Sequence, residues 1–182
     1  PGWYTSYTPY QPEVAQGRLE MLLNFQQMII DFTGMDIANA SLLDEGTAAA
    51  EAMGLCNRLD KMDKKIVFIS VDCHPQTIEV IKTRAEPLGL KVIIGNDNEL
   101  SNLSEDIICG ILQYPGTLGD IKDPSENISK IKKKNGKAIL VCDLLSLAKL
   151  KTPAELGADI AVGSSQRFGI PLGYGGPHAA FF

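Results

Sequence analysis

The fold prediction starts from the stretch ADIAVGSSQRFG, residues 158–169, in which a short apolar segment runs directly into a polar turn. Residues 158–162 have the apolar, β-branched character of a strand that is buried on both faces of a sheet. Gln166 follows four residues after this run, and a glycine-rich segment, residues 173–178, comes next. Open α/β sheets bind ligands at the carboxyl ends of such strands. A glycine-rich turn that simply joins two strands is the alternative interpretation.

Short apolar runs of this kind recur along the whole chain. They are residues 66–71, 90–94, 107–112, 138–142, 158–162 and 178–182. Amphipathic helical patterns lie between several of them, at residues 47–59, 76–88 and 125–134. Alternating strands and helices are typical of parallel sheets with right-handed crossovers. We therefore predict an α/β fold with a mostly parallel, doubly wound sheet of about six strands and helices on both faces.

The N-terminal part of the chain has a different pattern. Its periodic apolar positions are Leu22, Phe25, Ile29 and Phe32. Their spacing predicts an amphipathic helix over residues 18–33, and Gly34 is a typical helix stop. The preceding residues 4–12 contain three tyrosines and two prolines and cannot form a regular helix. We interpret residues 1–34 as an N-terminal segment with an interface helix, and residues 35–182 as one domain.

Length and composition agree with part of a soluble enzyme that has a single core. The chain has 182 residues, of which 45% are hydrophobic, and a formal net charge of −5. The negative charge gives no basic surface for nucleic acid or an anionic membrane, and no apolar run is long enough to span a bilayer. The cysteines are Cys56, Cys73, Cys109 and Cys142. Because they are scattered and have little histidine support, we expect buried thiols rather than metal ligands or disulfides. The chain starts at Pro1 without Met and stops at Phe182 inside an apolar run, which we interpret as a fragment. We therefore expect exposed apolar surface near Phe181 and Phe182.

A small-residue turn enters the predicted helix at Asp44-Glu45-Gly46-Thr47. Free backbone N–H groups at the start of this helix, together with the Thr47 hydroxyl, are suited to hold a phosphate. The alternative is an ordinary helix cap, in which Thr47 or Asp44 satisfies the first turn. The carboxylates of Asp44 and Glu45 weaken phosphate binding, since like charges repel.

Two further polar residues follow predicted strands. His74 comes after residues 66–71, where an imidazole could stack on a planar aromatic cofactor or relay a proton. Its alternative roles are to cap the next helix or to bond a backbone carbonyl. Asp143 comes after residues 138–142, where its carboxylate could face a protonated pyridine nitrogen, an Arg or a helix N-terminus. Its alternative role is a structural cap on the segment that begins at Leu144.

Gln166 completes a characteristic order of positions along the chain. Enzymes of the aspartate aminotransferase fold, which carry pyridoxal phosphate (PLP), have four positions in this order along the chain. These are the turn that binds the phosphate, the His that stacks on the ring, the Asp that faces the pyridine nitrogen and the Schiff-base position. In that fold a Lys stands where this chain has Gln166. An amide nitrogen is not a nucleophile and cannot form an imine with PLP. The order is more specific than any of its members, and no dinucleotide, P-loop or metalloprotease motif competes with it.

Several segments resemble a known family. They are YTPYQPE (residues 7–13), QGRLE (16–20), ANASLLDEGT (38–47), HPQT (74–77) and GSSQRFG (163–169). These segments resemble the P-protein of the glycine cleavage system, in the N-terminal, lysine-free half of its duplicated architecture. The resemblance implies a PLP-dependent transferase-like large domain of fold type I, incomplete at its C-terminus. It also implies glycine dehydrogenase (aminomethyl-transferring) activity for the whole enzyme.

The resemblance implies roles for particular residues. Cofactor-binding positions are Gly46, Thr47, His74 and Asp143, and interface positions toward the active half are Tyr7, Tyr10 and Gln11. No catalytic residue is implied in this half, because Gln166 departs from the Schiff-base Lys. The cofactor roles are consequently those of a pocket that no longer holds PLP covalently, and the lysine-bearing half holds the cofactor instead.

The implied partners are that lysine-bearing half, fused or as a separate subunit, the lipoyl H-protein and glycine, in a dimer of pseudodimers or a heterotetramer. The implied location is the cytoplasm for a bacterial source, which the Lys-, Asn- and Ile-rich middle of the chain favours, or the mitochondrial matrix for a eukaryotic one. Two other functions stay open, a non-catalytic interaction scaffold and an α/β domain for a phosphorylated ligand. Gln166 favours the scaffold, whereas the joint presence of Thr47, His74 and Asp143 favours the ligand role.

Overall fold

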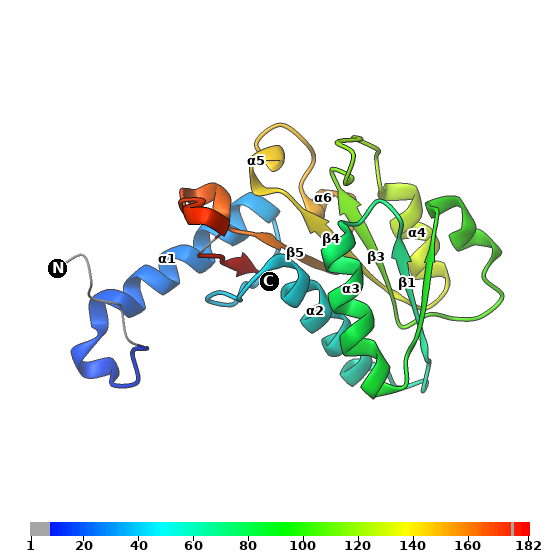
Figure 1. The fold of residues 1–182 in the computed structure, drawn as a ribbon, viewed down its shortest axis with the longest axis horizontal. Coiled ribbons are helices and arrows are strands. Elements are labelled where there is room, and N and C mark those ends of the chain that lie inside the picture. Colours follow the sequence, from blue (N-terminus) through cyan, green and yellow to red (C-terminus); the bar gives the residue numbers. More distant parts are fainter. Residues whose placement is uncertain (1–7, 176) are drawn as a thin grey trace.

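A single mixed sheet forms the centre of the structure, a computed structural model in which residues 8–175 and 177–182 are described (Figure 1). Within these residues six strands pair in the order β2-β1-β3-β4-β5-β6. They are β1 (Ile66–Ser70), β2 (Lys91–Gly95), β3 (Cys109–Tyr114), β4 (Lys137–Cys142), β5 (Ile160–Ser164) and β6 (Ala180–Phe181). Strands β1 to β5 are parallel to their neighbours, and β6 is antiparallel to β5. The predicted mostly parallel sheet is confirmed, and every predicted run contains a strand whose ends shift by at most two residues.

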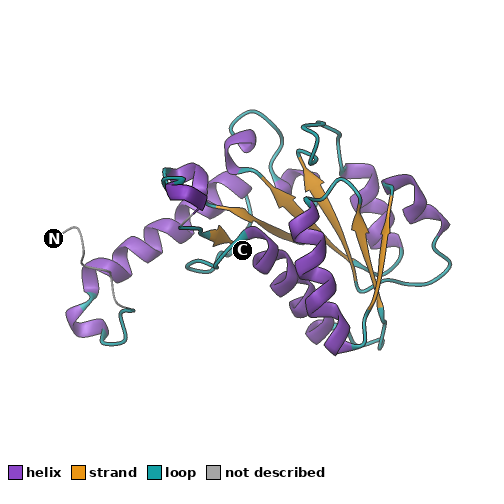
Figure 2. Ribbon diagram, viewed as in Figure 1, coloured by secondary structure: helices purple, strands orange, loops and turns teal. Residues whose placement is uncertain are grey.

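Helices cover both faces of this sheet (Figure 2). They are α1 (Gln16–Thr33), α2 (Glu45–Leu59), α3 (Pro75–Ala85), α4 (Ser125–Lys133), α5 (Leu144–Leu147) and α6 (Pro153–Leu156). Alternate residues of β1 divide the core: Val67 and Ile69 pack with α2 and α3, whereas Ile66 and Phe68 pack in the cluster that contains α1, α4, α5 and α6. The sheet is therefore doubly wound, as predicted.

Helix boundaries agree with the periodic patterns where the helices are long. Helices α1 and α2 each begin two residues before the predicted start, and α3 continues into a 3-10 turn at Glu86–Leu88. The sequence pattern does not predict α5 and α6, because helices of four residues are too short to show a helical period.

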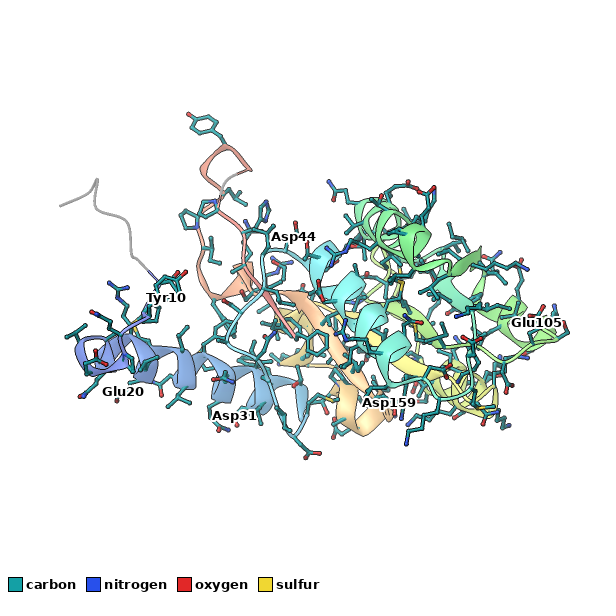
Figure 3. The ribbon with its side chains drawn as sticks, turned by 90° about the horizontal axis from the view of Figure 1, so that it is seen from below. Tyr10, Glu20, Asp31, Asp44, Glu105 and Asp159 are labelled. Atoms are coloured by element: carbon teal, nitrogen blue, oxygen red, sulfur yellow. The ribbon has the colours of Figure 1, made fainter. Side chains whose placement is uncertain are left out.

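Helix α1 is anchored at its C-terminal end and extends away from the sheet at its N-terminal end (Figures 1 and 3). Gly34 ends the helix in the left-handed region, at φ 70°, and its N–H donates to the Ile30 carbonyl at 2.8 Å, as a helix stop requires. Ile29 is buried, whereas Met21 and Leu23 are 68% and 65% exposed. Tyr10 and Glu20 lie near the far end of α1 in Figure 3.

The C-terminal residues differ from the sequence-based expectation of exposed apolar surface. Phe181 is fully buried in the cluster with α1 and α4, and Phe182 is half-buried. The backbone of the preceding loop explains this, because Asn39 donates its N–H to the Phe182 carbonyl at 3.0 Å and Leu42 bridges to Ala180. The expectation overlooked that residues 38–42 add a short pairing segment at this edge.

All four cysteines are buried and unpaired. Burial raises the pKa of the Cys73 and Cys142 thiols, which keeps them protonated at neutral pH. None of the helices in the described ranges is both long and apolar enough to cross a membrane.

Close backbone packing at Gly163 generates a first prediction. A Cβ at Gly163 of β5 would lie 2.1 Å from the Cys142 carbonyl oxygen of β4 and 2.7 Å from the Phe181 ring of β6. Gly163→Ala should therefore lower the free energy of unfolding by about 2–3 kcal/mol, because backbone and an aromatic ring must both move. Urea denaturation measures this change.

Gly17 provides the matched control for this substitution. A Cβ at Gly17, in the first turn of α1, meets no atom within 4 Å. Gly17→Ala should leave the protein as stable as before or more stable by about 0.5–1 kcal/mol, because alanine restricts the unfolded chain. Equal effects of the two substitutions would contradict the assignment of Gly163 to a close contact.

Candidate functional site

Two adjoining pockets of about 490 and 410 Å³ lie at the carboxyl edge of the sheet, next to the start of α2. Both are lined by Glu45, His74, Ser164 and Gln166. We call this shared site the edge pocket. Gly46 lines its first part and Asp143 its second. The structure thus brings four sequence-predicted positions together, namely Gly46, His74, Asp143 and Gln166.

Thr47 does not line the edge pocket. It lines a separate pocket of about 400 Å³ together with Leu42, Arg58 and Phe182. Its backbone N–H donates to Asp44 Oδ1 at 2.7 Å, and Asp44 has the extended backbone of a helix N-cap. The start of α2 is consequently capped from within the chain, as the structural alternative described.

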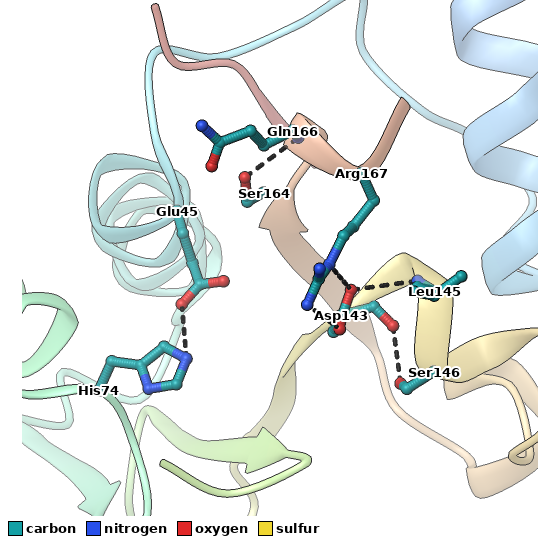
Figure 4. Close-up of polar contacts among 8 residues, drawn as sticks. All are labelled: Glu45, His74, Asp143, Leu145, Ser146, Ser164, Gln166 and Arg167. Atoms are coloured by element: carbon teal, nitrogen blue, oxygen red, sulfur yellow. Dashed lines mark hydrogen bonds and ion pairs between the residues drawn. The ribbon is translucent and has the colours of Figure 1, made fainter. Parts of the chain in front are cut away.

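Glu45 is the first residue of α2, and its carboxylate faces into the edge pocket (Figure 4). Its side chain is only 18% exposed. One carboxylate oxygen, Oε1, lies 3.8 Å from His74 Nε2 and accepts a hydrogen bond from the Thr77 hydroxyl at 3.4 Å. Burial raises the pKa of Glu45, against the opposite effects of His74 and of hydrogen bonds from Thr77 and the Ser164 backbone, and Asp143 raises it further.

His74 stands at the start of α3 without capping it. Its Nδ1 lies 2.8 Å from the Thr117 hydroxyl, and its Nε2 faces Glu45. The imidazole therefore lies between a loop hydroxyl and a carboxylate. It forms neither the helix cap nor the bond to a backbone carbonyl that the sequence analysis named as alternative roles. Its side chain is 41% exposed and lines both parts of the edge pocket.

The Asp143 carboxylate has two partners among the described residues, Leu145 and Arg167 (Figure 4). Its Oδ1 accepts the Leu145 N–H at 3.1 Å and caps α5. Arg167 donates from Nε to Oδ1 and from Nη2 to Oδ2, both at 3.0 Å, in a two-pronged ion pair. This pair raises the pKa of the Arg167 guanidinium, through hydrogen bonding to Asp143 first. The carboxylate thus already has the cap and the Arg partner that the sequence analysis named as alternatives to a pyridine nitrogen.

Gln166 begins a 3-10 turn, Gln166–Phe168, directly after β5. Its backbone N–H donates to the Ser164 hydroxyl at 3.2 Å, which orders the turn, and its side chain lines both parts of the edge pocket. No lysine of residues 8–175 and 177–182 lines this pocket. Lys151, one of the nearest lysines in sequence, is directed to Asp123 at 3.4 Å instead.

A comparison with protein families decides the assignment. The family model described as "Glycine cleavage system P-protein" matches residues 1–182. The chain belongs to this family. It is 82% identical over 182 residues to glycine dehydrogenase (decarboxylating) of Pelagibacter ubique, and 61% identical over 182 residues to that of Synechocystis. Each match covers 100% of the chain but only 19% and 18% of the relative, so the chain spans about a fifth of their length.

Solved structures agree with the P-protein assignment. A crystal structure of glycine decarboxylase (P-protein) in inhibitor-bound form superposes with a TM-score of 0.88 at 37% identity, over 97% of this chain and 41% of that one. A methionine gamma lyase from Micromonospora echinospora superposes with a TM-score of 0.66 at 15% identity, over 87% of this chain and 42% of that one. The second likeness shows the fold alone. The predicted PLP-dependent transferase-like fold of type I is confirmed.

The residues of the edge pocket do not fit PLP. At the helix end that would receive the phosphate, Asp44 and Glu45 place two carboxylates. Two unit charges 4 Å apart interact by about 4 kcal/mol at an effective dielectric constant of 20, which is unfavourable for like charges. Asp143 is bound by Arg167, and Gln166 offers no amine. We therefore derive no chemistry through PLP in this part of the P-protein.

Arg167, Glu45 and Thr117 take part in the contacts of this site, although the sequence analysis does not assign them to it. Arg167 stands next to Gln166 in the sequence, so a search for a cation near Asp143 could have found it. The sequence analysis considers Glu45 only for its charge beside the phosphate turn and does not predict its contacts with His74 and Thr77. Thr117 gives no signal, because it lies in a loop 43 residues after its partner His74.

Glu45 generates a prediction on the pH dependence of stability. Because its folded-state pKa is raised above the ordinary 4.5, the folded protein binds a proton there more tightly than the unfolded chain. Ionised Glu45 therefore lowers stability at neutral pH. Glu45→Gln should raise the melting temperature at pH 7, and this gain should fade as the pH falls to 4.5 and below. Thermal melts of both proteins across this pH range measure the effect.

Glu51 of the same helix is the control, since its carboxylate pairs with Arg84 outside the edge pocket. Glu51→Gln should give no comparable gain at pH 7. A lower melting temperature for Glu45→Gln than for the unmodified protein at pH 7 would contradict the prediction.

Proposed function

We propose that this chain is part of the lysine-free half of a glycine decarboxylase P-protein and supports the reaction rather than performing it. The observation that carries the proposal is Gln166, which lines the edge pocket of a P-protein family member where PLP enzymes of this fold have a Lys. Without an amine at this position the pocket has no group that condenses with an aldehyde.

The whole protein would decarboxylate glycine on PLP and transfer the aminomethyl group to the lipoyl arm of the H-protein. This part of the proposal is supported by the relatives named glycine dehydrogenase (decarboxylating). In it, the lysine-bearing half, fused or separate, holds PLP covalently, in a dimer of pseudodimers or a heterotetramer. The named relatives are bacterial, which supports the cytoplasmic alternative for the location.

The N-terminal segment, residues 1–34, is proposed as the contact with the lysine-bearing half, and residues 35–182 as the domain that presents it. Tyr10 is 73% exposed and Gln11 is also exposed. Both residues precede the N-terminal end of α1, which extends away from the sheet. Tyr7 lies outside the described residues. The exposed apolar side chains of α1, Met21, Leu23 and Met28, support a contact role, because the described part of the chain leaves them uncovered.

The pure scaffold is the stronger of the two alternatives. Asp44 and Glu45 beside the start of α2 oppose a phosphorylated ligand, and the pairing of Asp143 with Arg167 gives that carboxylate a structural role. A scaffold has no need of a free anion site in the edge pocket.

A trapping experiment tests the lysine-free assignment. The full-length protein is incubated with PLP, reduced with borohydride, digested and mapped by mass spectrometry. The adduct should be stoichiometric at one lysine outside residues 1–182, with only scattered, substoichiometric adducts inside this range. One stoichiometric adduct at a single lysine of residues 1–182, such as Lys149 or Lys151, would overturn the proposed function.

The interface proposal predicts a loss of activity from a double substitution. Tyr7→Ala combined with Tyr10→Ala removes aromatic contact area and should lower the decarboxylation rate of the full-length enzyme by about tenfold or more. The melting temperature should stay unchanged. Met62→Ala, at a 60% exposed position in the turn before β1, is the control that should leave the rate unaltered. Unchanged rate and assembly in the tyrosine variant would remove the interface proposal.

A further inference from the structure

Glu45 stands where the start of α2 would otherwise attract an anion. The Thr47 N–H donates to the Asp44 side chain, and the Ala48 N–H donates to the Asp44 carbonyl. The N–H groups of Glu45 and Gly46 in the first turn have no hydrogen-bond partner among the described residues, and they lie beside the carboxylate of Glu45 itself. A helix N-terminus favours one negative charge near it, and here the chain supplies that charge.

The charge of Glu45 has no strong cation to balance it. Among the described residues, the ion pair of this carboxylate is with His74, at 3.8 Å, and not with a Lys or Arg. Arg167, which lines the pocket, donates hydrogen bonds to both carboxylate oxygens of Asp143. The pocket therefore keeps an uncompensated negative charge in a partly buried position, where it is screened less than on an open surface.

We propose that Glu45 is the residue that excludes phosphate-bearing ligands, PLP among them, from the edge pocket. The inference rests on the proposed function, in which this half holds no PLP, and adds that the missing lysine is not the sole reason. Ligands without the phosphate dianion do not meet this barrier. The edge pocket thus discriminates by charge, and the phosphorylated cofactor is directed to the other half even where the ring would fit.

The test introduces an amine and compares two aldehydes that differ only in the phosphate. In the Gln166→Lys variant of the full-length protein, the new amine condenses with PLP or with pyridoxal and releases water, and borohydride reduces the imine to a stable secondary amine. The reduced adduct at position 166 is quantified by mass spectrometry. This readout separates position 166 from the lysine of the other half and does not depend on activity.

Adding Glu45→Gln to Gln166→Lys should increase the PLP adduct at position 166 by about tenfold or more, because the repulsion of the phosphate is removed. The pyridoxal adduct should stay the same. Adding Glu51→Gln instead, an equal charge change on the same helix outside the edge pocket, should alter neither adduct. Melting temperatures establish that each variant is folded.

A second measurement needs no change at Glu45. In the Gln166→Lys variant, raising the ionic strength should increase the PLP adduct relative to the pyridoxal adduct, because salt screens the repulsion. A PLP-to-pyridoxal ratio that Glu45→Gln leaves unaltered overturns the inference. Absence of both adducts from all three variants overturns it too, since the pocket would then exclude the ring regardless of the phosphate. Neither result touches the proposed function, which depends on the adduct of the unmodified protein.

Discussion

Parallel pairing of β1 to β5 is the constraint on which the rest of this structure depends. Parallel strands need a crossover between each pair, so the helices must lie on both faces and bury both sides of every central strand. The same pairing directs the carboxyl ends of all five strands to one edge. Residues as distant in sequence as His74 and Gln166 meet there because each follows one of these strands.

Several polar groups at this edge form hydrogen bonds with other groups of the protein, which stabilises the fold. Asp44 caps α2, Asp143 caps α5 and holds Arg167, and the Ser164 hydroxyl orders the turn that begins at Gln166. Each of these bonds satisfies a backbone or charged group at the carboxyl edge of the sheet. A pocket whose side chains are bonded to each other in this way keeps its shape but has few free groups for binding.

The parts of the structure that follow from local sequence signals agree best with the prediction. Apolar runs bounded by turn residues gave all six strands, and Gln166 could be placed after β5 from the same pattern. The agreement is poorest where the partner is remote. Whether Asp143 meets a pyridine nitrogen or Arg167, and whether Phe181 is covered, depends on which loops fold over the edge, and no periodicity encodes that. The sequence also does not predict which pocket the Thr47 side chain lines. The cap bonds only the backbone N–H of Thr47, so it does not fix the orientation of this side chain.

Phe168 links the two ends of the chain. Its ring lies edge-on to Phe25 at 6.1 Å and is tilted against Phe32 at 5.9 Å, so the turn that starts at Gln166 rests on α1. Through these three aromatic rings, α1 contacts that turn, while its N-terminal end extends away from the sheet. The packing of these rings therefore connects α1 to the backbone beside the edge pocket, more than 130 residues away in sequence.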